Sequence, residues 1–174
     1  MIILCDTRQQ IARHKLKDAW FEANGIEVRR TKLYVGDYTL PTNQQVCIDT
    51  KKDIQELVGD ICGKQHDRFR SELERAKESG IKLYILVENE SFTIKGKNVT
   101  SPFISKLDDL HKWVNPRLWI RKNGRQAYPN ATRGVTLMKC CKTMESRYGC
   151  EFLFCRPQDV GAKIIELLGG NTDV

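Results

Sequence analysis

The pattern of hydrophobic and polar positions predicts strands that alternate with helices along this 174-residue chain. Short apolar runs typical of strands occupy residues 2–6, 26–32, 46–51, 81–87 and 150–154. Apolar residues spaced three or four apart, as on one face of a helix, occur in residues 11–24, 53–62, 65–79, 132–148 and 157–168. Elements in this order are typical of a single mixed α/β domain.

Three stretches between these elements are less regular. Residues 34–40 predict another strand, and turn residues at 41–44 would join it to the strand at 46–51 as a hairpin. Residues 89–100 are polar and predict a mobile loop or a short hairpin. Residues 102–114 predict a helix, whose apolar residues are Phe103, Leu107, Leu110 and Trp113.

The candidate chemistry lies on the predicted hairpin. Because a strand points residues i and i+2 to the same face, Asp49 and Lys51 project side by side. If the connecting loop is centred on Asn43, Asp37 lies directly opposite Asp49. Two carboxylates that close repel each other unless a cation lies between them, and Mg²⁺ prefers oxygen ligands. The pattern predicts a metal-dependent nuclease site, although Asp-x-Lys also occurs on solvated strand edges that have no chemistry.

Further landmarks share their order and spacing with a known family. The chain has an apolar run that ends in Asp6-Thr7-Arg8, then Gly36-Asp37-Tyr38, Asp49-Thr50-Lys51, Arg68-Phe69, and a strand that ends at Glu88. Over about residues 1–90 this order resembles the nuclease domain of the XPF family of structure-specific DNA endonucleases, which belongs to the PD-(D/E)xK superfamily. The chain departs from the family at Gln9, where the family has Glu, at Asp49, where it has Glu, and at Thr50, where it has Arg.

The resemblance implies an α/β fold of the restriction-endonuclease-like type, with three layers around a central mixed sheet. It also implies hydrolysis of DNA phosphodiester bonds with Mg²⁺ or Mn²⁺, on branched or flap-type DNA in repair or recombination. Asp37 and Asp49 would ligate the metal, and Asp6 would complete its shell or hold a second ion. Lys51 would orient the attacking water or stabilise the transition state.

Phosphate contacts are expected from Arg8 and Arg68. A second candidate DNA-binding segment, residues 115–125, alternates cations with aromatic residues, and its Arg117 and Arg121 would contact the DNA backbone while Trp119 packs on a sugar or base. The alternative interpretation is that Trp113 and Trp119 belong to the core and the cations are only solvated.

Two other functions remain open. The departures at Gln9 and Thr50 suit a nuclease fold that has lost activity and only binds DNA, whereas a junction-resolving or restriction-type nuclease would keep the chemistry on another substrate. Retention of Asp37, Asp49 and Lys51 favours an active enzyme.

Composition and charge agree with these expectations. The chain has 29 Lys and Arg against 22 Asp and Glu, a net charge of +7 that favours polyanions but also suits an ordinary basic surface. Seven cysteines without a C-x-x-C pair predict reduced core residues of an intracellular, non-membrane protein and not a zinc site. We expect one domain over residues 1–174 with no helix-hairpin-helix module, so that a homodimer or a partner protein would supply specificity for DNA structure.

Overall fold

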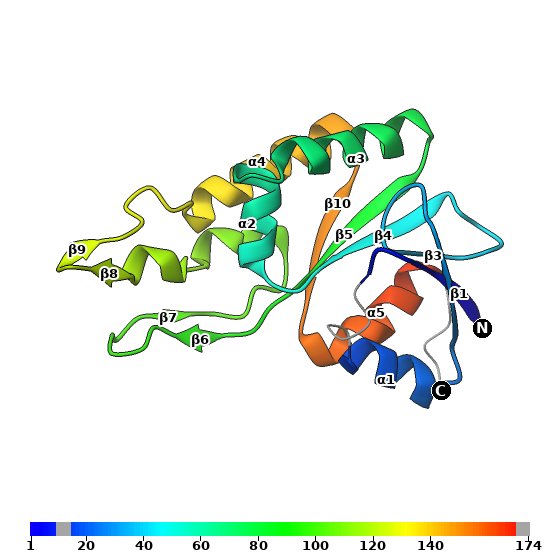
Figure 1. Ribbon diagram of the computed structural model, residues 1–174, viewed down its shortest axis with the longest axis horizontal. Helices are drawn as coiled ribbons and strands as arrows, with labels where there is room; N and C mark the ends of the chain where they lie inside the picture. Colours follow the sequence, from blue (N-terminus) through cyan, green and yellow to red (C-terminus); the bar gives the residue numbers. More distant parts are fainter. Residues whose placement is uncertain (10–14, 170–174) are drawn as a thin grey trace.

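The central feature of the computed structural model, which describes residues 1–9 and 15–169, is a six-stranded mixed sheet (Figure 1). Its strands lie in the order β10-β5-β4-β3-β1-β2. Their bounds are β1 Ile2–Asp6, β2 Glu27–Thr31, β3 Tyr38–Thr39, β4 Val46–Lys51, β5 Lys82–Glu88 and β10 Glu151–Cys155. The α-helices are α1 Lys15–Ala23, α2 Ile54–Cys62, α3 His66–Glu78, α4 Gly134–Tyr148 and α5 Val160–Leu167.

The strand directions bring several carboxyl ends to one edge of the sheet. β4 pairs in parallel with β5, β5 with β10, and β1 with β2, whereas β3 is antiparallel to both of its neighbours, β1 and β4. All strands of this sheet except β3 therefore run the same way. The ends of β1 and β4 and the start of β3 consequently lie at the same edge, where ligand sites of α/β sheets gather.

Helices cover both faces of the sheet, which makes three layers (Figure 1). On one face, Leu57 of α2, Leu73 of α3 and Leu137 of α4 pack in one core cluster with Ile85 of β5. On the other face, the helices α1 and α5 pack against a second cluster that contains Leu86, the next residue of β5. This alternation along β5 is the two-residue period of a strand that is buried on both sides. The predicted three-layer mixed α/β fold is confirmed.

Most of the predicted elements are present. β4 has the predicted bounds, and the strands and helices predicted at 2–6, 26–32, 53–62, 65–79, 81–87, 132–148 and 150–154 agree within two residues at each end. The helix predicted at 11–24 is described as α1 from Lys15, and residues 11–14 lie outside the described residues. The helix predicted at 157–168 begins with one 3₁₀ turn, η4 (Pro157–Asp159), before α5.

The strand predicted at 34–40 was wrong in extent, because only Tyr38–Thr39 is strand. Side-chain hydrogen bonds hold the preceding residues in a bent loop: the Leu33 amide donates to Asp6 Oδ2 at 2.8 Å, and the Gly36 amide donates to Glu72 Oε1 at 2.9 Å. These acceptors replace the partners that a strand would offer, so the local β propensity is overridden.

The helix predicted at 102–114 was also wrong in part, because only η2 (Leu107–Lys112) is helical, as a 3₁₀ helix. The buried Asn89 side chain donates to Ile104 O at 3.0 Å and accepts from the Ile104 amide at 2.8 Å. Since both backbone groups of Ile104 are taken in this way, the residue has neither for a helix.

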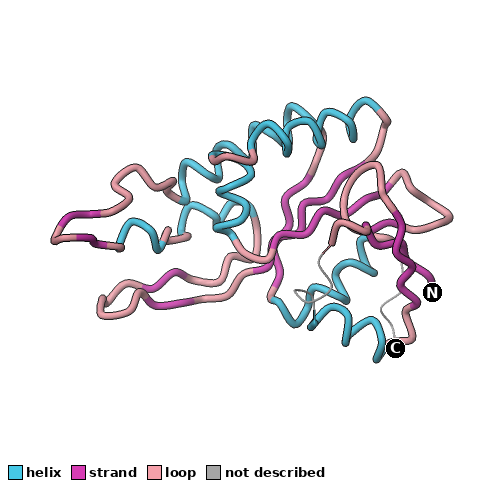
Figure 2. Tube along the Cα trace, viewed as in Figure 1, coloured by secondary structure: helices cyan, strands magenta, loops and turns pink. Residues whose placement is uncertain are grey.

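Residues 89–133 form a lobe that projects from the carboxyl end of β5 (Figures 1 and 2). It contains the hairpin of β6 (Phe92–Thr93) and β7 (Thr100–Ser101), the helices η2 and η3 (Pro116–Trp119), and the hairpin of β8 (Arg121–Lys122) and β9 (Arg125–Gln126). We call it the two-hairpin lobe. Across residues 1–9 and 15–169, no helix has the length and apolar character needed to span a membrane.

Candidate active site

The central hairpin brings the two predicted ligands to the same cavity. Tyr38 pairs with Ile48 and Thr39 with Cys47, so Asp37 directly precedes the paired part of β3 and Asp49 directly follows Ile48 in β4. The Asp37 amide donates to Ile48 O at 2.7 Å, and the Asp6 amide donates to Asp37 O at 2.8 Å. Backbone pairing therefore draws the ends of β1 and β4 together at Asp37.

Six of the eight residues that the sequence predicted for the site line a single cavity of about 460 Å³. They are Asp6, Arg8, Asp37, Asp49, Lys51 and Arg68. Arg68 reaches it from α3 and the others from the sheet edge. The remaining two, Arg117 and Arg121, are exposed in the two-hairpin lobe and do not belong to this cavity.

Lys51 is the buried cation of the cavity. Its Nζ lies 2.7 Å from Asp49 Oδ2 and 2.7 Å from Asp60 Oδ2 of α2, and 5.0 Å from the centre of the Phe69 ring. Burial alone lowers the pKa of a lysine, but the two carboxylates outweigh it and raise the pKa of Lys51 above its usual range. Lys51 is therefore a fixed ammonium at neutral pH.

Asp49 is a carboxylate with spare acceptor capacity. Only 5% of the residue is exposed, and its Oδ2 contacts Lys51 but accepts no well-formed hydrogen bond from the described residues. Burial raises its pKa well above the usual range, Lys51 opposes this rise, and the nearby Asp37 adds to it. An opposing positive charge in the cavity would favour the ionised form.

Thr50 orients Asp37 and links it to a cation behind the sheet. The amide and hydroxyl of Thr50 both donate to Asp37 Oδ2 at 2.8 Å. The hydroxyl in turn accepts from the buried Lys17 Nζ at 3.2 Å, and this ammonium lies 3.4 Å from Glu88 Oε1. Sequence analysis treated Thr50 only as a lost arginine, whereas the structure supplies a positive charge from α1 at this position.

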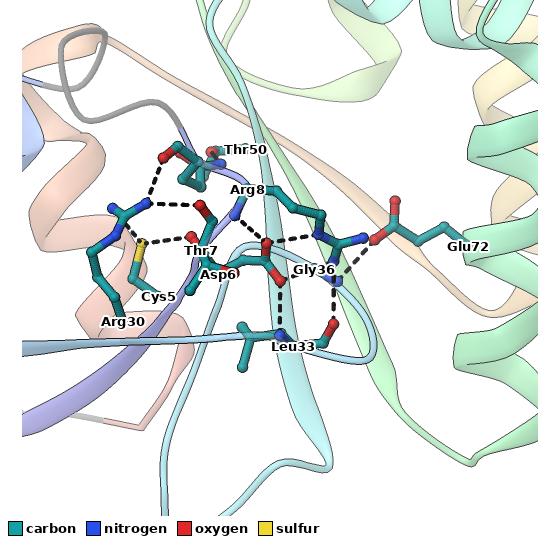
Figure 3. Close-up of polar contacts among 10 residues, drawn as sticks. Cys5, Asp6, Thr7, Arg8, Arg30, Leu33, Gly36, Thr50 and Glu72 are labelled. Atoms are coloured by element: carbon teal, nitrogen blue, oxygen red, sulfur yellow. Dashed lines mark hydrogen bonds and ion pairs between the residues drawn. The ribbon is translucent and has the colours of Figure 1, made fainter.

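Both carboxylate oxygens of Asp6 accept hydrogen bonds from nearby donors (Figure 3). Its Oδ1 accepts from the Arg8 amide and from Arg8 Nε, both at 2.7 Å, and its Oδ2 accepts from Arg8 Nη2 at 2.9 Å and from the Leu33 amide. Although burial alone would raise the pKa of Asp6, these hydrogen bonds outweigh it and hold the pKa below its usual value. Its role as a metal ligand stays a prediction, and this geometry favours positioning of Arg8.

Glu72 of α3 is a further carboxylate at the cavity, beyond Asp6, Asp37 and Asp49, that the sequence pattern did not indicate. Its Oε1 accepts from the Gly36 amide, so it supports the loop that carries Asp37 (Figure 3). The available signal was its spacing: Phe69, Leu73 and Ala76 form the buried stripe of α3, and Arg68, Glu72 and Arg75 occupy the adjacent row. Asp60 of α2, the second partner of Lys51, was also missed, because the helical pattern of α2 does not show that Asp60 contacts β4.

The donor set fits Mg²⁺ or Mn²⁺ held with water and substrate, and does not form a closed protein cage. Among the residues that the structure describes, no three acidic, histidine or cysteine side chains gather closely enough for such a cage. Mg²⁺ commonly takes one or two carboxylates and completes its shell with waters and phosphates. Asp37 and Asp49 have acceptor capacity to spare, so these two residues fit the ion best.

Gly36 sets the approach of the loop to β4. Its φ is +73°, and an added Cβ would lie 3.0 Å from Ile48 O and 3.2 Å from Cys47 Cβ. Gly96 has the same φ of +73° with no atom within 4 Å of such a Cβ, so it is a matched control. We expect Gly96→Ala to cost about 1–2 kcal/mol from backbone strain alone. Crowding at Gly36→Ala adds roughly 1–3 kcal/mol.

Urea unfolding of the two alanine variants checks this difference, because the φ penalty is common to both and cancels. Equal losses of stability would mean that the backbone at Ile48 moves away from the added Cβ with no measurable loss of free energy. Gly36→Ala is also expected to slow any reaction that depends on Asp37, and Gly96→Ala is not.

Comparisons with known proteins identify the family and the fold of the chain. A family model described as the ERCC4 domain matches residues 5–168. A structure of XPF from Aeropyrum pernix is similar with a TM-score of 0.58 at 15% identity, and covers 97% of this chain and 60% of that chain. A second one, in complex with DNA, gives 0.59 at 15% identity, with 97% and 63% covered. The chain thus spans about 60% of the length of these structures, and no curated protein sequence matches it.

Proposed function

This chain belongs to the ERCC4 domain family and has the fold of the XPF nuclease domain, and from that premise we propose that it is a metal-dependent endonuclease that hydrolyses phosphodiester bonds of branched or flap-type DNA. The observation that carries the proposal is the convergence of Asp37, Asp49 and Lys51 on one cavity at the carboxyl edge of the sheet. A structure of XPF with DNA among the similar folds supports DNA as the substrate class.

The residues of the cavity divide into three tasks. Asp37 and Asp49 hold the divalent ion, which, when bound, polarises the scissile phosphate and lowers the pKa of a bound water. Lys51 keeps Asp60 as its partner and places a positive charge beside the phosphorus, where negative charge grows in the transition state. Arg8 and Arg68 contact the phosphates on either side.

The reaction adds a water oxygen to phosphorus and breaks the P–O3′ bond. The departing 3′ oxygen takes up a proton, and the products are a 5′-phosphate and a 3′-hydroxyl. Asp6 acts through Arg8: two of its four accepted hydrogen bonds, from Nε and Nη2, hold the guanidinium of this 59% exposed side chain at the cavity where a phosphate would approach. Pre-oriented cations lose little conformational freedom on binding, which favours correct placement of the substrate.

Metal titration on a panel of labelled DNA substrates tests the proposal. Linear duplex, flap, fork and four-way junctions are incubated with Mn²⁺, with Mg²⁺ and with chelator. We expect cleavage only with metal, and faster cleavage of flaps and forks than of linear duplex. DNA binding that persists in chelator, without cleavage of any substrate at saturating metal, would instead establish the inactive binding module, and cleavage confined to four-way or linear DNA would favour the other nuclease classes.

A further inference from the structure

The two-hairpin lobe carries most of the net charge of the chain. Residues 89–133 contain nine Lys and Arg against three Asp and Glu, whereas the other 129 residues contain 20 against 19. The lobe therefore has a net charge of +6 out of +7. A charge gathered this strongly on one projection is the electrostatic footprint of a polyanion-binding surface.

Ion pairs among the described residues do not neutralise most of the cations of the lobe. Two of the three acids of the lobe already have partners, since Asp109 pairs with Lys112 at 2.7 Å and Asp108 pairs with Lys142 of α4. Among the residues that the structure describes, eight cations of the lobe have no acidic partner within 4.0 Å. These are Lys95, Lys97, Lys106, Arg117, Arg121, Lys122, Arg125 and Arg133.

A groove of about 590 Å³ lies between the two hairpins. Lys97 from the first hairpin, Arg121 from the second, and Arg133 line it together with Trp119. Trp119 is 40% exposed, whereas Trp113 is buried at 6%, so the structure separates two tryptophans that the sequence left together. An exposed indole between cations offers a stacking surface next to phosphate contacts, which is how proteins hold unpaired bases.

The walls of the groove are held in place by polar contacts. The Asn115 side chain donates to Thr132 O at 2.8 Å, and the Ser101 hydroxyl accepts from the Val114 amide at 3.1 Å. Gln126 Nε2 donates to Leu118 O at 2.6 Å, which ties β9 to η3. A preformed groove loses less conformational entropy on binding than one that must order first.

The lobe that holds the groove begins next to the strand that carries Lys51. Lys51 pairs with Val87 across the parallel strands β4 and β5, and the lobe leaves the sheet immediately after Glu88. Figure 2 shows that the lobe extends from this end of the sheet.

We infer that the groove between the two hairpins binds a single-stranded segment of DNA, with a base stacked on Trp119 and phosphates held by Lys97, Arg121 and Arg133. An unpaired strand suits the site because the bases of a duplex are stacked on each other and do not offer their faces to an indole. The inference builds on the proposed function, since it makes this strand the single-stranded arm of the DNA that is cut. Binding itself does not require cleavage.

Fluorescence anisotropy with the whole chain in EDTA tests the groove without any cleavage. The probes are labelled dT12 and a labelled 12-base-pair duplex. Trp119→Ala is expected to weaken dT12 binding by roughly 5- to 100-fold, the range found when a base-stacking aromatic residue is removed. The control is Tyr128→Ala, because Tyr128 is 41% exposed in the same lobe but does not line the groove, and it is expected to change binding by less than about twofold.

The cations are tested by the salt dependence of binding. Replacing Lys97, Arg121 and Arg133 by Gln is expected to reduce the slope of log K against log salt for dT12 by about 2, since each lost phosphate contact removes about 0.7. The charge-matched control replaces Lys15, Lys64 and Lys139, which are exposed and lie outside both the groove and the cavity. It is expected to change the slope much less.

Two results would overturn the inference: dT12 binding that Trp119→Ala leaves unchanged, or equal effects of the two triple variants. Either would reduce the lobe to a general basic surface. Cleavage assays distinguish this outcome from failure of the proposed function. Metal-dependent cleavage without dT12 binding in the groove would contradict only the inference. Binding of dT12 in the groove without cleavage would contradict only the proposed function. If both hold, Trp119→Ala slows cleavage of a duplex with a single-stranded arm more than cleavage of a blunt duplex.

Discussion

Asp49→Asn is expected to lower the rate of metal-dependent DNA cleavage by about a hundredfold or more, because the metal ion supplies several kcal/mol of transition-state stabilisation and loses one of its two carboxylates. The measurement is a single-turnover rate at saturating Mn²⁺ on a flap substrate. Asp37→Asn is expected to lose activity to a similar degree, since Asp37 is the other carboxylate with spare acceptor capacity.

The structure gives reasons to expect that Asp49→Asn folds normally. The variant removes a buried carboxyl group whose pKa is raised by burial. Lys51 keeps Asp60 as an ionic partner at 2.7 Å. Asparagine has nearly the same shape as aspartate, so the packing around β4 is preserved. Loss of cleavage with an unchanged unfolding midpoint therefore isolates the chemistry from the fold.

Asp18→Asn is the matched control for the loss of one negative charge. Asp18 is exposed on α1 and does not line the cavity, so its variant is expected to cleave at the rate of the unmodified chain. Binding to DNA in chelator should be equal or tighter in Asp49→Asn, because a negative charge next to the phosphate has gone. Undiminished cleavage by Asp49→Asn would remove Asp49 from the metal site and the proposed mechanism with it.

Sequence alone was sufficient for the central hairpin, because its geometry depends on local rules. A period of two sets Asp49 beside Lys51, and turn residues around Asn43 set the register that pairs Tyr38 with Ile48, which leaves Asp37 and Asp49 at the same end of the hairpin. Both rules act within about fifteen residues of chain. The same rules failed at 34–37, where Asp6 and Glu72, from other parts of the fold, take the backbone amides of Leu33 and Gly36.

The remaining parts of the site come from tertiary packing that no local pattern describes. The helical period of α3 identifies Phe69 and Leu73 as its buried side, but not that the adjacent Glu72 faces the loop before β3. Lys17 is 2% exposed on a helix where a lysine normally faces solvent, and only the position of α1 on the sheet brings it to Thr50. The placement of the helices on the sheet decides these contacts, and the spacing of residues along a helix does not specify that placement.

Lys51→Met is expected to destabilise the protein more than any other single change at the site. The methionine fills similar space, but Asp49 and Asp60 lose the ammonium that lies 2.7 Å from each of them. Removing one partner of a buried ion pair typically costs about 3–5 kcal/mol, because the remaining charge is left uncompensated. For a chain of this size that corresponds to a fall in Tm of roughly 6–20 °C.

Two variants show whether the stranded carboxylates cause this loss. Lys82→Met removes a lysine that pairs with Glu151 at 3.1 Å on the surface, with side chains 40% and 45% exposed, and is expected to cost less than about 1 kcal/mol. The triple variant Asp49→Asn, Lys51→Met and Asp60→Asn removes the whole charge cluster. It is expected to recover most of the stability that Lys51→Met loses, and failure to do so would mean that Lys51 acts through packing.

The pH dependence of the stability lost in Lys51→Met is an independent test of its electrostatic origin. The pKa of Asp49 is already raised by burial, and without Lys51 the opposing influence disappears and the pKa rises further. A carboxyl group with a raised pKa in the folded state binds a proton more tightly there than in the unfolded chain. Stability relative to the unmodified protein is therefore best below the unfolded-state pKa of about 4, where both states are protonated. It falls as the pH rises from there to the folded-state pKa, and stays low above it. A deficit that stays constant between pH 4 and pH 8 in urea unfolding would contradict an electrostatic origin, whereas a deficit that grows with pH would trace it to the two carboxylates that Lys51 holds together.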